Sequence, residues 1–465
     1  MATGIGLGLC FAAGIILRLS LFRTNLPDWF AERVEISNAL TSWQKTLDGI
    51  ALQDNDISPY RGDLFHETPI MLRVFSFVSK VLSSKMHYFF VFIDILSGLV
   101  LASMGKEFSR YLLQKQVNNV KNYAVGVEKI ILRKDHVDLI PLAIVATHFL
   151  NPYSVAVCLG KSTAVINNFF IFLTFMFMLK GNLLMCMGTI AMATYQSLYP
   201  VMLLVPAAIY FQHMSGQTKK TESSQFITGC GVTSMVGVGM TLGLYLISYF
   251  LEGSMRFLGA TTGFILGVPD LTPNLGVFWY FFTEMFEHFR PFFICVFQIN
   301  AFLYTVPLAV KLRDHPVFLA YVLVTLMSIF KSCPLFFSRD HPVFLAYVLV
   351  TLMSIFKSYP SYADVAVFIT LLPMWKHVFS YMRNTFVVTN MFLVCMVMSP
   401  ILWHLWIYAG SANANFYFAI ALTFSTAQIF LIADLMFGYL RREFDLHNGL
   451  KHKLDNGKDA QIVME

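Results

Sequence analysis

The chain has 465 residues, of which 57% are hydrophobic and only 13% are charged, and its formal net charge is +6. A soluble domain carries roughly 25% charged residues, so the composition excludes an ordinary soluble enzyme and indicates an all-α polytopic membrane protein. The basic residues are spread over the loops, which argues against a nucleic-acid partner. The seven cysteines are scattered and odd in number, so they predict neither a disulfide framework nor a metal site.

The N-terminal part of the chain alternates between apolar and polar stretches. Residues 1–22 are apolar and lack a basic start, which favours a retained spanning helix over a cleaved signal peptide. Residues 23–85 are polar and are expected to form a folded luminal loop on the membrane surface. Residues 88–104 predict the next span, with Asp94 inside it. Residues 105–138 carry seven basic side chains, so the positive-inside rule places this loop in the cytoplasm.

Between residues 139 and 211 the apolar runs are short. They are interrupted at residues 151–153, 161–168 and 193–200 by segments rich in Pro, Asn, Ser and Tyr. Irregular backbone at membrane depth is tolerated only where protein or a water-filled cavity covers it. The pattern therefore predicts broken helices around a cavity.

Further spans are expected toward the C-terminus, where the basic tail, residues 441–465, favours the cytoplasm. Because both termini then lie on one side of the membrane, the number of crossings is even. We expect about twelve crossings within one membrane domain, residues 1–440. The later spans are predicted at residues 226–251, 292–310, 317–330, 365–375, 386–407 and 416–440.

One segment occurs twice without a single difference, at residues 313–332 and 339–358. Repeats of a solenoid drift in sequence, so perfect identity indicates a recent duplication or an error in the assembled gene. If both copies cross the membrane, every later span is inverted and the basic tail lies on the wrong side. We therefore expect one copy to be dispensable or absent from the native protein.

Residues 267–289 combine a turn-rich polar start with a dense aromatic run. The prolines in this start favour a turn, and a helix is expected to begin near Leu275. At helical spacing, the aromatic residues share one face and the polar residues another, which is typical of an interfacial helix or of a wall that receives a lipid headgroup. The spacing does not match a His-Glu-x-x-His zinc motif, so a metal site is not predicted. The polar face consists of Tyr280, Glu284, Glu287 and His288.

Several blocks in the same order resemble the phosphatidylinositol glycan class U family, a subunit of the GPI transamidase. The resemblance extends from the first helix to the tail and is interrupted only by the duplicated segment. The blocks are SPY at 58–60, FHETP at 65–69, LNPY at 150–153, KSTAVINN at 161–168, ATYQSLYP at 193–200, residues 268–289, WHLWIYAGSANANF at 403–416 and YLRRE at 439–443.

The resemblance implies a multi-pass protein of the endoplasmic reticulum membrane, in a complex that removes a C-terminal signal peptide and attaches a GPI lipid. Its partners would be the other transamidase subunits, the GPI lipid and the precursor proteins. Cleavage in that complex belongs to a caspase-like subunit with a Cys-His pair. This chain would therefore be a non-catalytic subunit that presents GPI, without a cofactor, a metal or a catalytic residue of its own.

A GPI headgroup would need side-chain amides, hydroxyls and aromatic rings at the membrane interface. The block at residues 403–416 supplies these groups, although Asn and Ser are also favoured simply for capping the last helix. The candidate GPI contacts are His404, Trp406, Tyr408, Ser411, Asn413 and Asn415 from this block, with Trp279, Glu284, Glu287 and His288 from the earlier segment.

Two other functions stay open on the sequence. The family resembles the multi-spanning mannosyltransferases that use dolichol-phosphate mannose, which implies a GT-C-like architecture. Such an enzyme needs a pair of carboxylates in the first luminal loop, where Glu32 with Glu35, or Asp54 with Asp56, could serve. Loops rich in Asp are usually solvated turns, however, and the fold can be inherited without the chemistry. A purely architectural subunit is the third alternative.

Overall fold

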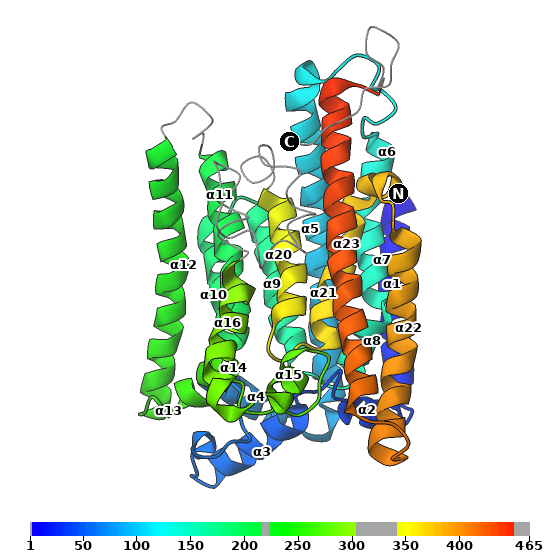
Figure 1. Ribbon diagram of the computed structural model, residues 1–465. Helices are drawn as coiled ribbons and strands as arrows, with labels where there is room; N and C mark the ends of the chain where they lie inside the picture. The colour runs from blue at the N-terminus through cyan, green and yellow to red at the C-terminus, as the bar shows by residue number, and fades with distance from the viewer. Residues whose placement is uncertain (1, 216–222, 304–341, 451–465) are drawn as a thin grey trace.

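The computed structural model of the protein describes residues 2–215, 223–303 and 342–450, and within these ranges its regular secondary structure is entirely helical. The long helices run side by side in one bundle, with α12 at one flank and α1 and α22 at the other (Figure 1). The shorter helices α2, α3 and α4 lie at the lower end of this view. The prediction of an all-α protein is confirmed for the described residues.

The first two predicted spans are present, but the second helix is longer than expected. Helix α1 covers Ala2–Leu21, and α5 covers His87–Asn119, so it continues into the stretch expected to be a basic loop. It continues because Phe108 and Leu112, one turn apart, stay buried and extend the apolar face. The polar stretch between these helices contains α2 (Leu26–Ala31), α3 (Trp43–Asp54), η1 (Pro59–Arg61), α4 (Pro69–Leu82) and η2 (Ser83–Lys85).

The expected interruptions after residue 139 are present. The α7–α8 junction bends by 48°, and the Asn151 side chain caps α8 by accepting from the Tyr153 backbone N–H. At the other two interruptions the backbone takes a positive φ, +50° at Lys161 and +58° at Leu198. The elements here are η3 (Val120–Asn122), α6 (Lys134–Val137), α7 (Ile140–Leu150), α8 (Pro152–Leu159), α9 (Ala164–Leu179), α10 (Leu183–Ser197), η4 (Tyr199–Leu203) and α11 (Leu204–Met214).

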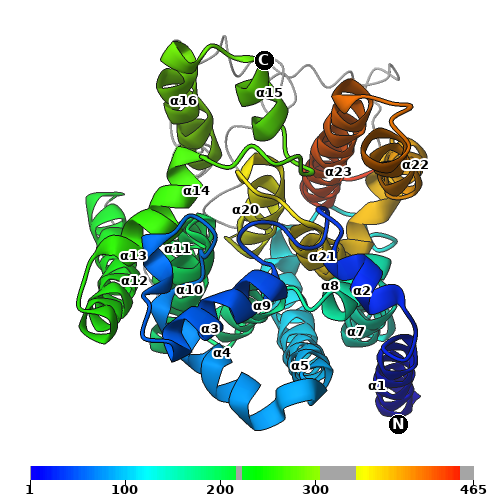
Figure 2. The same cartoon turned by 90° about the horizontal axis from the view of Figure 1, so that it is seen from below.

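The second half of the chain returns to long helices. The second copy of the duplicated segment forms α20, whose residues are buried from Pro342 to Ile355, whereas the first copy lies outside the described residues. Seen from below, α15 lies near the ends of α22 and α23 (Figure 2). The elements are α12 (Ser223–Glu252), α13 (Arg256–Leu258), η5 (Gly259–Gly263), α14 (Phe264–Gly267), α15 (Phe278–Glu284), η6 (Glu287–Phe289), α16 (Arg290–Leu303), α20 (Pro342–Phe356), α21 (Tyr362–Leu371), η7 (Leu372–Tyr381), α22 (Thr385–Trp403), η8 (His404–Tyr408) and α23 (Ala414–Asn448).

Within the described ranges, five helices are long and apolar enough to cross a membrane, or six if the bent pair that ends in α8 counts as one span. Two further apolar helices, α9 and α20, are shorter. These lengths support a multi-pass membrane protein. The sequence-based expectation of about twelve crossings exceeds these five or six helices, and it stays a prediction.

Asp94, which the sequence places inside a span, has charged and polar partners from two other helices. Its carboxylate lies 2.5 Å from the Arg18 guanidinium of α1 and 3.2 Å from Nε2 of His148 in α7. Arg18 also donates to the backbone carbonyl of Phe149 at 3.0 Å. Because an unpaired charge in the bilayer costs several kcal/mol, this group ties α1 to the bundle.

Candidate functional site

The two segments that the sequence singled out, residues 267–289 and 403–416, meet in the structure. Trp279 of α15 stacks on Trp406 of η8 with ring centroids 6.0 Å apart, and the Tyr417 ring of α23 is 6.3 Å from Trp279. We call the group formed here the aromatic–amide cluster. It consists of Trp279, Tyr280, Trp403, Trp406, Asn413, Asn415, Tyr417 and Phe418.

The two asparagines of the cluster have different local roles. Asn413 is the extended N-cap residue of α23, and its side-chain oxygen accepts from the Asn415 backbone N–H at 3.1 Å. Asn415 lies in the first turn of α23, where its Oδ1 accepts a hydrogen bond from the Tyr280 hydroxyl. The expected capping role is therefore present. Both side chains remain exposed, and within the described residues neither amide nitrogen has a hydrogen-bond partner.

The segment around Trp406 is a π-helix, a form that often marks functional sites. It turns Trp406 toward the cluster and leaves His404 and Tyr408 exposed, with their rings 5.3 Å apart. Ser411 is held to the same segment, since its backbone N–H donates to the Leu405 carbonyl at 2.9 Å. Three of the predicted contact residues therefore form an exposed edge next to the cluster.

The predicted polar face of residues 280–288 is wrong. Helix α15 begins at Phe278 rather than near Leu275 and ends at Glu284, because Met285 and Phe286 are extended. The chain turns back there, so that α16 packs on α15 with Phe278 and Phe297 5.1 Å apart. Of the polar face only Tyr280 reaches the cluster. Glu284, Glu287 and His288 are exposed, and none has a hydrogen bond or an ion pair to it within the described residues.

Arg33 and Glu35, from the first polar stretch, form a buried ion pair that contacts the cluster. Arg33 donates to both carboxylate oxygens of Glu35, at 3.1 and 2.9 Å. The Tyr417 hydroxyl donates to the same carboxylate at 3.0 Å, and the Arg33 guanidinium lies 5.9 Å from the Trp403 ring centroid. From the sequence, Glu35 was a candidate only for catalysis, and its structural role was not predicted. Arg33, two residues before it, was the available signal.

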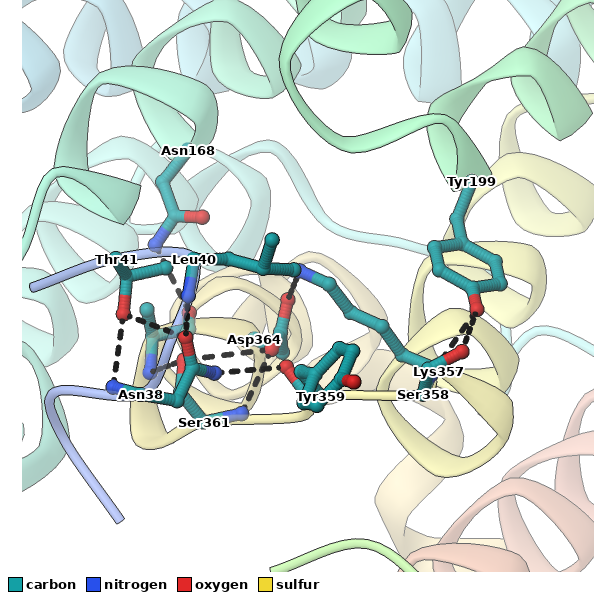
Figure 3. A network of polar contacts seen from close by, with 11 residues as sticks. Asn38, Leu40, Thr41, Asn168, Tyr199, Lys357, Ser358, Tyr359, Ser361 and Asp364 are labelled. Carbon is teal, nitrogen blue, oxygen red and sulfur yellow. Dashed lines mark hydrogen bonds and ion pairs between the residues drawn. The ribbon is translucent and has the colours of Figure 1, made fainter. Parts of the chain in front are cut away.

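The same polar stretch makes a second network with the bundle, and Figure 3 shows the part of it around Asn38 and Thr41. The Tyr362 backbone N–H donates to the Glu35 carbonyl at 2.7 Å, and the Asn38 amide donates to the Tyr359 carbonyl at 2.9 Å. The Thr41 carbonyl accepts from the Thr163 backbone N–H at 3.0 Å. The stretch is therefore tied to the starts of α9 and α21.

Glu67, in the FHETP block, makes a further contact between the polar stretch and the start of α9. The Thr163 hydroxyl donates to its carboxylate. Enclosure of the carboxyl group raises the pKa of Glu67 to about 7, and the hydrogen bond from Thr163 opposes this shift. Glu67 therefore changes charge near neutral pH.

Lys357 and Asp364 form a further, largely buried ion pair between the end of α20 and the start of α21 (Figure 3). The two charged groups are 3.0 Å apart, and Asp364 also closes a capping box with Ser361. The Ser-x-x-Asp spacing is a sequence signal for this helix start. Beside the pair lies a cavity of about 20 Å³, partly lined by Asn167 and Ser197 from two of the predicted interruptions.

In the described part of the chain, no group of three His, Cys, Asp or Glu side chains lies close enough together to hold a metal ion.

Known proteins match the chain over almost its whole length. A model of the family described as GPI transamidase subunit PIG-U matches residues 12–338 and 333–424. The mouse GPI-anchor transamidase component PIGU is 40% identical over 461 residues, 99% of each chain, and its human counterpart is 39% identical over 459 residues, 98% of this chain and 99% of its own. The GPI transamidase component GAB1 of Saccharomyces cerevisiae is 28% identical over 453 residues, 97% of this chain and 96% of its own.

The two family matches overlap only at residues 333–338, the short stretch that separates the two identical copies. Each match therefore contains one copy, as an insertion relative to the family would produce. The identity and the coverage together establish that the chain belongs to the PIG-U family of GPI transamidase subunits.

Proposed function

We propose that this protein is a non-catalytic subunit of the GPI transamidase, which binds the GPI lipid and presents it for attachment to precursor proteins. The observation that supports this most directly is the meeting of two distant segments in the aromatic–amide cluster. A glycolipid headgroup combines sugar faces, hydroxyls and phosphates. Aromatic rings suit the sugar faces, and side-chain amides can donate to phosphate and hydroxyl oxygens.

The two asparagines are the residues that we assign to the headgroup. Their oxygens are used within the protein, Asn413 for capping and Asn415 for Tyr280. Their amide nitrogens are therefore the groups available to donate to a ligand. His404, Tyr408 and Ser411, at the exposed edge, would extend the contact surface, whereas Glu284, Glu287 and His288 lie on another exposed surface and are not part of this proposal.

Membership of the family supports the location and the partners that we propose. The protein would lie in the endoplasmic reticulum membrane, with about twelve crossings in a GT-C-like arrangement. Residues 23–85 would face the lumen, where the precursor signal is cleaved by a caspase-like subunit. Residues 105–138 and the tail would face the cytoplasm.

Asn415→Asp tests the headgroup assignment. Aspartate keeps an acceptor for Tyr280 but replaces the amide donor by a negative charge that repels phosphate. We expect a loss of about tenfold in surface display of GPI-anchored proteins, the equivalent of about 1.4 kcal/mol, with normal co-purification of the other subunits. Asn413→Ser keeps a cap and removes the amide, so it should give a smaller loss.

Asn55→Asp is the matched control, because it adds the same charge at an exposed asparagine of α3's C-terminal end. It should leave display unchanged. Unchanged display in Asn415→Asp would contradict the assignment. Loss of co-purification in that variant would instead favour a purely architectural role.

The alternative, a mannosyltransferase, is less well supported. Two of its four candidate carboxylates are already in ion pairs, Glu35 with Arg33 and Asp54 with Lys80 at 2.8 Å. The two functions predict different lipids in cells that lack the protein. Complete GPI should accumulate if the protein presents GPI, whereas a truncated glycan would indicate a missing sugar transfer.

We also propose that one copy of the duplicated segment is dispensable. Removing residues 313–338 or residues 333–358 yields the same shortened chain, because the copies are identical. A tryptic peptide that spans Ser332, Cys333 and Pro334, found in protein from the source cells, would refute the idea that the native chain lacks the extra copy.

A further inference from the structure

We infer that Tyr280 is a positioning residue of the proposed headgroup site, whose hydroxyl holds the Asn415 amide with its nitrogen turned toward the ligand. The inference rests on the proposed function, because it concerns one of the two asparagines that we assign to the headgroup. It goes further by naming a residue that acts through Asn415 instead of touching the lipid. The supporting observations are the two contacts of Tyr280 with α23, the packing of its ring and the polarity of its hydrogen bond.

Tyr280 contacts one face of α23 at two points. Its ring stacks on Phe418, with centroids 4.2 Å apart and planes inclined by 18°, and its hydroxyl donates to Asn415 Oδ1. Residues three positions apart on a helix lie on the same face, and Asn415 and Phe418 have this spacing. The two contacts therefore fix the Tyr280 hydroxyl relative to the first turn of α23.

The Tyr280 ring is also held by its neighbour in α15. The Trp279 ring meets it edge-on, with centroids 5.5 Å apart and an interplanar angle of 82°. Trp279 is buried, and its indole N–H donates to the Asn274 backbone carbonyl at 2.9 Å. A tyrosine has only two side-chain torsions, so a ring that packs against two others leaves its hydroxyl little freedom.

The polarity of the hydrogen bond decides which end of the Asn415 amide faces outward. A side-chain amide has an oxygen that only accepts and a nitrogen that only donates. Because the Tyr280 hydroxyl donates to the oxygen, the nitrogen of the planar amide points away from Tyr280. Asn415 is exposed, so this nitrogen is open to a ligand. An amide rotated by half a turn would present its oxygen instead, and an oxygen cannot donate to a phosphate.

The other polar groups of the cluster do not duplicate this role. In the part of the chain that the structure describes, Tyr280 is the one residue that hydrogen-bonds to the Asn415 side chain. Tyr417 cannot replace it, because the Tyr417 hydroxyl donates to Glu35. Asn413 needs no such residue, since the Asn415 backbone N–H holds its oxygen. Loss of the Tyr280 hydroxyl should therefore act on the site through Asn415 alone.

Tyr280→Phe tests the inference, because it removes the hydroxyl and keeps the ring that stacks on Phe418. We expect surface display of GPI-anchored proteins to fall about threefold, the equivalent of about 0.7 kcal/mol and within the range of one ordinary hydrogen bond. The other subunits should co-purify normally, and tryptophan fluorescence should not change, because the rings keep their packing. Loss of co-purification would mean that the hydroxyl holds the fold, and would overturn the inference.

A double variant separates positioning from an independent effect of Tyr280. Asn415→Ala removes the amide, so we expect display to fall about fivefold, and adding Tyr280→Phe to it should cause no further loss. A further threefold loss in the double variant would show that Tyr280 does not act through Asn415.

The single variants distinguish this inference from the proposed function. If Asn415→Ala lowers display and Tyr280→Phe does not, Tyr280 has no positioning role, but the headgroup assignment stands. If neither variant lowers display, the headgroup assignment fails and the positioning role fails with it.

Tyr245→Phe is the matched control. Tyr245 of α12 is also partly buried, and its hydroxyl shares a hydrogen bond with Thr262 Oγ1 of η5 at 2.9 Å. It packs against the apolar group that contains Phe257 rather than against the aromatic–amide cluster. Display should stay normal in Tyr245→Phe. Equal losses in Tyr245→Phe and Tyr280→Phe would indicate a general effect of losing a tyrosine hydrogen bond, and would contradict the inference.

Discussion

The aromatic–amide cluster and the Lys357–Asp364 pair both join segments that are far apart in the sequence, but they treat polar groups in opposite ways. In the cluster, stacked rings hold the elements together, while Asn413 and Asn415 stay exposed. At the ion pair, the charged groups themselves hold the elements together, with side chains only 8% and 14% exposed. An exposed amide can exchange water for a ligand at little cost, whereas a buried charge cannot lose its partner. The aromatic–amide cluster therefore suits ligand recognition, and the Lys357–Asp364 pair suits a structural role.

The largest expected effect comes from breaking a buried pair within the bundle. Asp94→Ala leaves the Arg18 guanidinium, which is fully buried, without its carboxylate. We expect it to destabilise the protein by about 3–5 kcal/mol, measured as a loss of monodisperse complex in detergent. The double variant Arg18→Leu with Asp94→Leu should recover much of this loss, because it removes both charges. If the single and the double variants behave alike, the pair is not what holds α1.

A smaller effect is expected at Glu35, where the two regions meet. Glu35→Ala removes the partner of Arg33 and the acceptor for Tyr417, and should cost about 1.5–3 kcal/mol. Glu35→Gln keeps an oxygen for Tyr417 and should cost less. Because three tryptophans pack nearby, intrinsic fluorescence should change in Glu35→Ala before assembly is lost. An unaltered spectrum would show that the cluster keeps its packing without the ion pair.

A third test uses the protonation of Glu67, which lies where the polar stretch contacts the start of α9. The folded-state pKa of about 7 lies above the ordinary value of 4.5, so the folded protein keeps a proton that the unfolded chain loses between these values. The contribution of Glu67 to the free energy of unfolding therefore falls as pH rises from about 4.5 to about 7, and is constant above that.

Glu67→Gln removes this titration and keeps an acceptor for Thr163. The difference in thermal midpoint between wild type and Glu67→Gln should shift in favour of the variant from pH 5 to about pH 7 and stay constant above that. Asp63→Asn, at an exposed position of the same loop, is the control. A difference that does not vary with pH would contradict the raised pKa.

The smallest effect is expected from deleting residues 313–338. The shortened chain keeps one copy of the segment that forms α20 and leads directly into Tyr359, whose carbonyl accepts from Asn38. Both regions should therefore be retained, with complex yield and GPI attachment at wild-type levels. Reduced attachment with normal yield would show that the extra copy has a function.

Local sequence patterns predicted the structure correctly where neighbouring residues determine the backbone conformation. The interruptions at Asn151 and Tyr199 could be predicted because Asn and Pro act through the backbone next to them. The break after Glu284 could not, since no Pro or Gly marks it and only the packing of α16 on α15 produces it. Likewise, Asp94 could be identified as a charge inside a span, but its partners Arg18 and His148 lie on helices distant in the sequence.

The amino-acid sequence by itself determined the helical membrane class, the family and the two segments rich in aromatic and polar groups, because hydrophobicity and motif order are written residue by residue. Only the tertiary structure decided that Trp279 meets Trp406, that Glu35 is neutralised by Arg33, and that Lys357 faces Asp364. Those contacts join different elements, and which elements become neighbours depends on the packing of the whole bundle rather than on any local pattern.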